Sequence, residues 1–452
     1  MTRLYRLADA AAGAFALLGL LVLVFGAFSV SFGPWPIRVS GADRLFFIAA
    51  AIVAVRHAAH PSDPLHRRLV RFARMPRASA DAAARVAVVS RIAVLIAGYA
   101  AVVTLGIPSR AAGFTVSADP VLDLPARFDA GWYGTIALEG YSFQARFDRQ
   151  QNVAFFPAFP LLSRVLGYPF GAFAPHVPAE RRLARVLWAG VVISCAAFAW
   201  AAVYVWRLAR EMLGEDRAPT AVALLAAYPF AVYFSAAYAE SVFLLGSVAA
   251  FYHFRRDELA RAAAWGLLVG LARPNGCFLS VVLGVLALER LRPAPARQLA
   301  SSPIHPFARW LAAAAPGVGM LVFSAYVKHL TGAWFGWARL HETWGRTLGA
   351  FGSLSSPYDV CNAGAVVFAL AMLWPVVRRT GVACGVLVLV NVLPPLLAGG
   401  VLSMGRVTAT IFPLFLALAA IAPARIVTAL VTAFAIGEAA VAAIFFTWRP
   451  LF

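Results

Sequence analysis

The stretch RFDAGWYGTIALEGY, residues 127–141, places an arginine, two carboxylates and four aromatic rings together in an otherwise apolar chain. A carboxylate such as Asp129 can accept a proton from a hydroxyl group, which is the work of a general base. Asp129 can equally cap a short helix that we expect over Ala130–Glu139, with Gly140 ending it. From these residues alone, both interpretations of Asp129 stay open.

The other polar residues of this stretch are candidate substrate contacts. Trp132 and Tyr133 would share one face of the short helix, which suits a helix lying at a membrane surface. Glu139 would face an unfavourable dipole at the helix C-terminus and therefore needs water or a partner. Arg127 could orient Asp129 or bind a phosphate, and Tyr141 is a further candidate contact.

Three more charged residues interrupt apolar runs later in the chain. Glu240 follows the stretch YPFAVYFSAAYA, Arg273 and Asn275 lie in ARPNG, and Arg406 lies in SMGRVTATIFPLF. Arginines bind phosphate with two parallel hydrogen bonds, so two of them at one membrane depth would suit an anionic ligand. Alternatively, Glu240 pairs with a nearby arginine for structure, and the arginines extend to the membrane interface.

The stretch TGAWFGWARLHETWGR contains three tryptophans and His341. Trp344 and His341 are candidate substrate contacts, since tryptophan rings can stack on a sugar. Tryptophans are also typical of the belt that holds a membrane protein at the lipid–water interface. The residues leave these two interpretations equally open.

The elements that must position these residues are membrane-spanning helices. The chain has 452 residues, of which 62% are hydrophobic and only 13% are charged, so we predict an all-α polytopic membrane protein. Its short basic loops account for the net charge of +19 better than a nucleic-acid-binding face does. Apolar runs predict about 11–13 spans, near 10–32, 43–58, 86–107, 183–206, 218–236, 238–254, 261–273, 276–290, 311–330, 360–377, 381–400, 406–421 and 425–446.

Arginine-rich loops predict the orientation of these spans. The basic loop between the second and third spans, with RLAREMLGEDR and RRDELAR, should be cytoplasmic. The segment 109–182 and the polar stretches described above then fall on the extracytoplasmic side. We expect residues 1–85 to form an N-terminal two-helix element with a basic loop, and 86–452 to form the core.

The sequence offers little sign of a metal or disulfide site. Cys195, Cys277, Cys361 and Cys384 lie in apolar surroundings without CxxC spacing, which favours small buried or lipid-facing residues. No metal-ligand cluster stands out around Asp129, so the sequence requires no cofactor; a divalent metal stays open but is not indicated.

The order of these motifs resembles the PIG-V family, which includes the second mannosyltransferase of GPI-anchor assembly and bacterial relatives. The resemblance is carried by RFDAGWYGTIALEGY, FFPAFPLL, YPFAVYFSAAYAESVF, GLARPNG, TGAWFGWARLHETWGR and SMGRVTATIFPLFLALA, from about residue 86 onward. Three positions depart from the family pattern. Phe128 stands where tryptophan is expected, Ala272 where a hydroxyl residue is common, and His341 where glutamine is frequent.

The resemblance implies a GT-C-type bundle with a large extracytoplasmic loop carrying interfacial helices. It also implies an inverting glycosyltransferase, a mannosyltransferase, that uses a polyprenyl-phosphate sugar donor and a lipid or glycan acceptor. Asp129 would be the general base, with Arg273 and Arg406 stabilising the leaving phosphate. Separately from the resemblance, the high alanine and arginine content suggests a GC-rich bacterial genome, and hence localisation in the plasma membrane. The alternatives are a lipid-linked sugar transporter and an inactive subunit of a glycan-assembly complex.

Overall fold

The computed structural model describes residues 2–25, 28–32, 35–39, 41–59, 80–108, 113–289, 306–349 and 356–449. Helices make up almost all of this part of the chain, which confirms the predicted all-α polytopic class. The exception is a hairpin of two antiparallel strands, β1 (Phe28–Phe32) and β2 (Trp35–Val39). The first predicted span, 10–32, was therefore wrong at its end. Helix α1 (Thr2–Phe25) stops early, since the alternating pattern FSVSF fits a strand.

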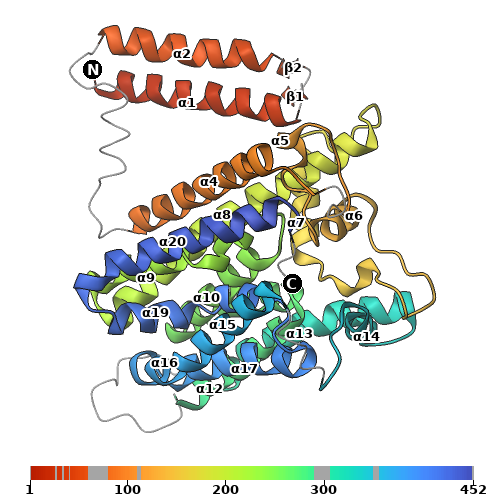
Figure 1. The fold of residues 1–452 in the computed structure, drawn as a ribbon, viewed down its shortest axis with the longest axis vertical. Helices are drawn as coiled ribbons and strands as arrows, with labels where there is room; N and C mark the ends of the chain where they lie inside the picture. The colour runs from red at the N-terminus through yellow and green to blue at the C-terminus, as the bar shows by residue number, and fades with distance from the viewer. Residues whose placement is uncertain are drawn as a thin grey trace.

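The N-terminal element lies at the edge of the main bundle, where α1 contacts α8 (Ala179–Leu213). Helix α1 packs beside α2 (Ala42–Ala59), and Figure 1 shows this pair at that edge. Most of the basic loop that follows it, residues 60–79, lies outside the described residues. The division of the chain at residue 85 stays a prediction.

Six helical segments in the described part of the chain are long and apolar enough to cross a membrane. They are α4 (Ala80–Leu105), α8 (Ala179–Leu213), α13 (Pro306–Thr331), α15 with α16 (Pro357–Ala371 and Leu373–Thr380), α17 (Val382–Gly399) and α20 (Ala424–Phe446). A seventh crossing would be a bent pair of helices. This number is smaller than the predicted 11–13, although each predicted run is mainly helical.

The difference arises because prolines and glycines break several apolar runs into short helices. The shorter elements are η2 (Glu215–Arg217), α9 (Ala218–Ala226), η3 (Pro229–Ser235), α10 (Glu240–Arg255), α11 (Leu259–Ala272), η4 (Pro274–Phe278), α12 (Leu279–Glu289), α18 (Met404–Ala409) and α19 (Phe412–Ile421). Proline lacks the N–H that would continue a helix. These breaks fall where the polar motifs lie.

The break between α9 and η3 is held by a buried arginine. The segments 215–226 and 229–235 meet at an angle of 79°. Arg91 of α4 donates to the carbonyls of Ala226 and Ala231, on the two sides of the break, and pairs with Glu438 of α20 at 2.7 Å. The hydrogen bonds from Arg91 to these carbonyls stabilise the bend inside the bundle. The bend in turn positions the residues from η3 to Glu240.

The segment predicted as a large loop carries α5 (Pro120–Asp123), α6 (Ala130–Glu139), η1 (Asn152–Ala154) and α7 (Ala158–Gly167). The predicted helix over Ala130–Glu139 is confirmed, and Gly140 ends it with a φ of 86°. The stretch NVAFFPAFPLLSRVLGYPF forms η1 and α7, as an interfacial pair would. Helix α7 exposes Leu161, Val165 and Tyr168, which suits contact with lipid.

The ends of the helices fall into two groups with different composition. Arg217, Arg378 and Arg379 line a small pocket with the C-terminus of α8, and Arg217 donates to the carbonyls of Ala419 and Ala422. The breaks at η4 and α18 lie at the opposite end of the bundle, beside α6, α14 (Gly336–Leu340) and η5 (His341–Trp344). The basic loops and the aromatic polar motifs therefore lie at different ends.

Candidate active site

Asp129 lies directly before α6, and its side chain does not cap the helix. Its carboxylate Oδ2 instead binds Arg406 Nη1 at 2.6 Å, so the helix-capping interpretation was wrong. The preceding residue, Phe128, has a φ of 46°, a left-handed conformation that costs energy for a residue with a large side chain. The Asp129 amide also donates to the Tyr238 hydroxyl at 3.0 Å. These contacts direct the carboxylate away from its own helix.

Glu240 connects the two arginines that interrupt the apolar runs. It begins α10 and its side chain has no exposed surface. Glu240 Oε1 lies 2.5 Å from Arg273 Nη1 at the end of α11, and it also contacts Arg406 Nε of α18. Asp129, Arg406, Glu240 and Arg273 thus form a chain of alternating charge that we call the charge chain. Its two carboxylates balance its two guanidinium groups.

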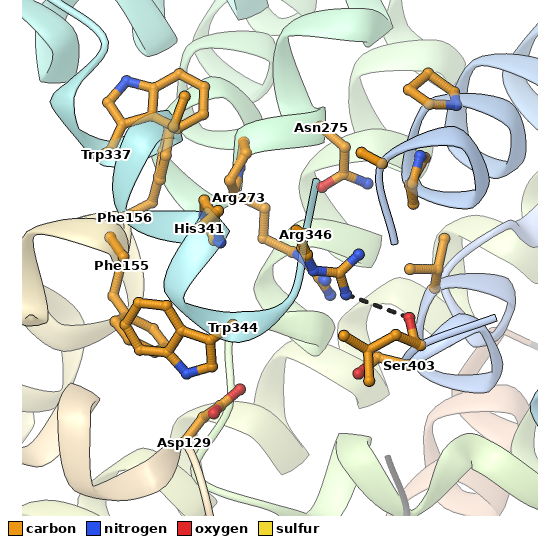
Figure 2. Close-up of a pocket in the computed structure, with 18 of the residues that line it drawn as sticks. Asp129, Phe155, Phe156, Arg273, Asn275, Trp337, His341, Trp344, Arg346 and Ser403 are labelled. Atoms are coloured by element: carbon orange, nitrogen blue, oxygen red, sulfur yellow. Dashed lines mark hydrogen bonds between the residues drawn. The ribbon is translucent and has the colours of Figure 1, made fainter. Parts of the chain in front are cut away.

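The charge chain borders a cavity of about 680 Å³. Its volume lies in the range of pockets that bind small ligands. Figure 2 shows Asp129 on one side, Arg273 and Arg346 deeper in the pocket, and the rings of Phe155, Trp337 and Trp344 along another wall. The lining also contains Cys277 and the apolar residues Phe278, Pro394, Pro395, Ala398, Leu402 and Val407.

Seven of the residues predicted from the sequence line this cavity, and five do not. The lining includes Asp129, Tyr133, Arg273, Asn275, His341, Trp344 and Arg406. The lining does not include Arg127, Trp132, Glu139, Tyr141 and Glu240, although Glu240 holds two residues that line it. The structure therefore brings together residues that are almost 280 positions apart, as in the contact between Asp129 and Arg406.

Arg127 is completely buried and lies away from the lining. It pairs with Asp123 at 2.9 Å and donates to the carbonyl of Phe446 at 2.6 Å. Burial lowers its pKa, while Asp123 acts in the opposite direction. These contacts connect the segment before α6 to the end of α20. Arg127 therefore positions Asp129 through the backbone and does not contact its carboxylate.

The remaining three predicted contacts surround the cavity wall. Trp132 stacks on Phe155 with ring centroids 5.8 Å apart, and the Tyr141 hydroxyl donates to the Phe155 carbonyl at 2.8 Å. Both residues therefore support Phe155, which lines the cavity. Glu139 is exposed at the end of α6, where water can solvate its carboxylate.

His341 faces the cavity as a neutral imidazole. Burial lowers its pKa to about 4, and the nearby positive charges of Arg346, Arg406 and Arg273 act in the same direction. Its Nε2 has no hydrogen-bond partner in the described part of the chain. The rings of Trp337 and Trp344 lie 6.4 and 6.2 Å from its ring. A neutral imidazole here can exchange a hydrogen bond with a bound ligand.

Sequence analysis missed Arg346, Gln150 and Ser403, which also line the cavity. Arg346 could have been considered because it ends the stretch TGAWFGWARLHETWGR, which contains the candidate contacts His341 and Trp344. Gly345, with a φ of 74°, ends η5 and turns the chain there. Nothing in the sequence distinguished Gln150 or Ser403 from other polar loop residues.

No group of three or more metal-ligating side chains lies together in the parts of the chain that the structure describes. Asp129, which lines the cavity, and Glu240, which lies behind the lining, are both held by arginines. That the protein requires no cofactor stays a prediction.

Residues 109–301 match the family model described as mannosyltransferase (PIG-V). This match confirms the resemblance recognised from the motifs, and it supports a glycosyltransferase. It includes Asp129, Glu240 and Arg273, whereas the stretches that contain His341 and Arg406 lie beyond it.

The fold was also compared with solved structures. The chain is similar to the oligosaccharyltransferase of Archaeoglobus fulgidus tethered to an acceptor peptide, with 13% identity and a TM-score of 0.42. That similarity covers 80% of this chain and 55% of the other, so the chain spans about half the length of that protein. The apo form of the same enzyme gives 13% identity, a TM-score of 0.41, and coverage of 80% and 56%. No curated protein matches the sequence.

Proposed function

We propose that the protein is an inverting glycosyltransferase that moves mannose from a polyprenyl-phosphate donor to an acceptor hydroxyl. The observation that carries this proposal is the single cavity in which the Asp129 carboxylate and the Arg273 and Arg406 guanidinium groups meet. A base and a cationic surface are the two elements that such a transfer needs. The match to a mannosyltransferase family supports the choice of sugar.

In the proposed reaction, Asp129 accepts the proton of the acceptor hydroxyl as its oxygen attacks the anomeric carbon. The bond from that carbon to the donor phosphate breaks on the opposite face, so the configuration inverts. Oδ2 of Asp129 is held by Arg406, which leaves Oδ1 as the oxygen that takes the proton. The second negative charge on the departing polyprenyl phosphate is stabilised by the guanidinium side of the cavity.

The residues that line the cavity are of types that can contact the sugar and the lipid of such a donor. Trp337 and Trp344 offer ring faces to a sugar, and His341 offers one hydrogen-bonding nitrogen. Pro394, Pro395 and Phe278 offer an apolar surface to the first units of a polyprenyl chain. Donor and acceptor would therefore bind at the extracytoplasmic end of the bundle, opposite the basic loops.

The first test of this proposal is Asp129→Asn. Arg406 keeps Glu240 as a partner in this variant, so folding should be retained. We expect transfer of radiolabelled mannose from polyprenyl-phosphate mannose to fall by about a hundredfold or more in membranes containing the variant.

The matched control is Glu215→Gln, which removes an exposed carboxylate from η2 and should leave transfer unchanged. Equal transfer by wild type and Asp129→Asn would reject Asp129 as the base. If neither protein transfers the label, movement of the labelled lipid across vesicle membranes would test the transporter alternative.

A further inference from the structure

The cavity contains three arginines, and only two of them have carboxylate partners. Arg273 and Arg406 belong to the charge chain, where Glu240 and Asp129 balance them. Arg346 has no carboxylate within 4.0 Å among the described residues. Its side chain makes one hydrogen bond, from Nη2 to the Leu402 carbonyl at 3.3 Å. The cavity therefore carries one positive charge that no described protein group neutralises.

The Arg346 side chain is held in place without being neutralised. Its backbone N–H donates to the His341 carbonyl at 3.3 Å, and Gly349 binds the Leu397 carbonyl at the end of α17. Gly399 leaves room for the side chain, since a Cβ atom there would lie 3.3 Å from Arg346 Cγ. Figure 2 shows the guanidinium deep in the pocket, close to Arg273 and Ser403. Such a fixed side chain loses little entropy when it binds a ligand.

Burial and the neighbouring arginines lower the pKa of Arg346 to about 10. This value keeps the guanidinium charged at neutral pH, in a setting that disfavours the charge. A partly buried cation without a partner is costly, and a bound anion removes that cost. Because a guanidinium matches phosphate geometry with parallel hydrogen bonds, a phosphate ester is the anion that fits it best.

We propose that Arg346 binds the phosphate of the polyprenyl donor, whereas Arg406 and Arg273 chiefly hold Asp129 and Glu240. This inference rests on the proposed function for the identity of the donor. It assigns leaving-group recognition to a residue outside the segment that matches the family model. A phosphodiester carries one negative charge, which equals the one unneutralised positive charge of the cavity.

The test measures binding without turnover. The purified full-length protein in detergent is titrated with farnesyl phosphate, and binding is followed by the fluorescence of tryptophans such as Trp337 and Trp344. Arg346→Gln should weaken binding of farnesyl phosphate by about tenfold or more. Binding of farnesol, which lacks the phosphate, should stay the same in wild type and variant. Arg346→Lys, which retains the charge, should recover part of the affinity.

The matched control is Arg339→Gln. Arg339 lies on the neighbouring α14, is exposed, and stacks on Phe147 outside the cavity, so its loss should not change binding. Thermal unfolding shows whether each variant is folded. If Arg346→Gln is unstable, two other measurements test the assignment. The affinity of wild type for farnesyl phosphate should fall as the salt concentration rises, and Arg346→Lys should keep part of that affinity.

Equal affinity of wild type and Arg346→Gln for farnesyl phosphate would overturn the assignment. Arg346-dependent binding of phosphatidylglycerol with similar affinity would also overturn it, because the site would then bind any phospholipid head group. Arg346-dependent binding of farnesyl phosphate together with absence of sugar transfer would support the phosphate site and contradict the transferase. The two proposals can therefore fail separately.

Discussion

At the scale of single residues, the charge chain explains how four ionised groups lie together at the edge of a membrane bundle. Each carboxylate contacts an arginine, and Glu240 and Arg406 each contact two partners. Burying an isolated charge costs several kcal/mol, and removing Glu240 or Arg406 would leave Arg273 or Asp129, respectively, without its partner in the charge chain. The charge chain therefore orients the Asp129 carboxylate, while Arg346 and His341 remain available to a ligand.

The depressed pKa of His341 predicts a dependence of stability on pH. The unfolded chain takes up a proton at this histidine near its usual pKa of 6.5, whereas the folded protein does so only near pH 4. The unfolded state therefore binds more protons between these values, and this contribution to the free energy of unfolding decreases as pH falls from about 6.5 to 4. We expect the thermal midpoint of wild type to fall more steeply than that of His341→Gln between about pH 7 and pH 5.

Comparison with His341→Gln removes the contribution of other groups that titrate in this interval, because the variant retains them. Glutamine is also frequent at this position in the family that the motifs resemble, so the variant should fold. Parallel curves for the two proteins would show that His341 is not held neutral by its surroundings.

At the scale of elements, the site is built from the ends of short helices. Glu240 begins α10, Arg273 follows α11, and Arg406 lies within the six residues of α18. Each of these elements begins or ends at a break in an apolar run. Polar side chains can occupy these breaks because the irregular backbone lines a cavity and is not exposed to lipid. The breaks that shorten the spans are therefore the features that form the site.

Helix α18 depends on a close approach to η3. A Cβ atom at Gly405 would lie 2.2 Å from the ring of Phe230, so Gly405→Ala must displace α18 or that ring. We expect this variant to lose about 1–3 kcal/mol of stability. We also expect reduced sugar transfer, since the adjacent Arg406 moves relative to Asp129. Thermal unfolding and the transfer assay measure the two effects.

The matched control is Gly364→Ala on α15, which packs against α18. No atom lies within 4 Å of a Cβ at Gly364, so the substitution should be neutral or slightly stabilising. If Gly405→Ala behaves like Gly364→Ala in both assays, the contact between α18 and η3 does not position Arg406.

At the scale of the whole molecule, the two ends of the bundle differ in charge and in shape. The end with Arg217, Arg378 and Arg379 has a small pocket between basic loops, and the other end has the large cavity. The positive-inside rule predicts that the basic end is cytoplasmic. The cavity should then open toward the extracytoplasmic side, where it can receive a lipid-linked sugar.

This orientation can be tested with introduced cysteines. In a background where Cys195, Cys277, Cys361 and Cys384 are replaced, Ala145→Cys lies in the exposed segment after α6, and Asp216→Cys lies in exposed η2. A thiol reagent that does not cross membranes should label Ala145→Cys in intact cells. It should label Asp216→Cys only after the membrane is made permeable. The opposite pattern would place the cavity in the cytoplasm.

Much of the fold was predictable from the sequence, and seven of the twelve predicted site residues line the cavity. Helix α6 and its end at Gly140 were predicted because local capping signals determine them. Six helical segments of the described residues are long and apolar enough to cross a membrane, fewer than the predicted spans, because apolar length in the sequence does not show which runs bend. Arg346 was missed because an arginine in a loop has no local mark that distinguishes a ligand contact from a solvated charge.

The amino-acid sequence alone indicated a helical membrane protein and the gathering of its polar motifs at one end of the helices. It also indicated Asp129 as a candidate site residue. These properties follow from hydrophobicity and from local backbone preferences, which act over a few residues. The pairing of Asp129 with Arg406 in place of a helix cap and the burial of Arg127 away from the cavity are visible only in the folded chain. The same is true of Arg346, which has no carboxylate beside it among the described residues. Partners for a charge come from segments hundreds of residues apart, and packing of the whole chain selects them.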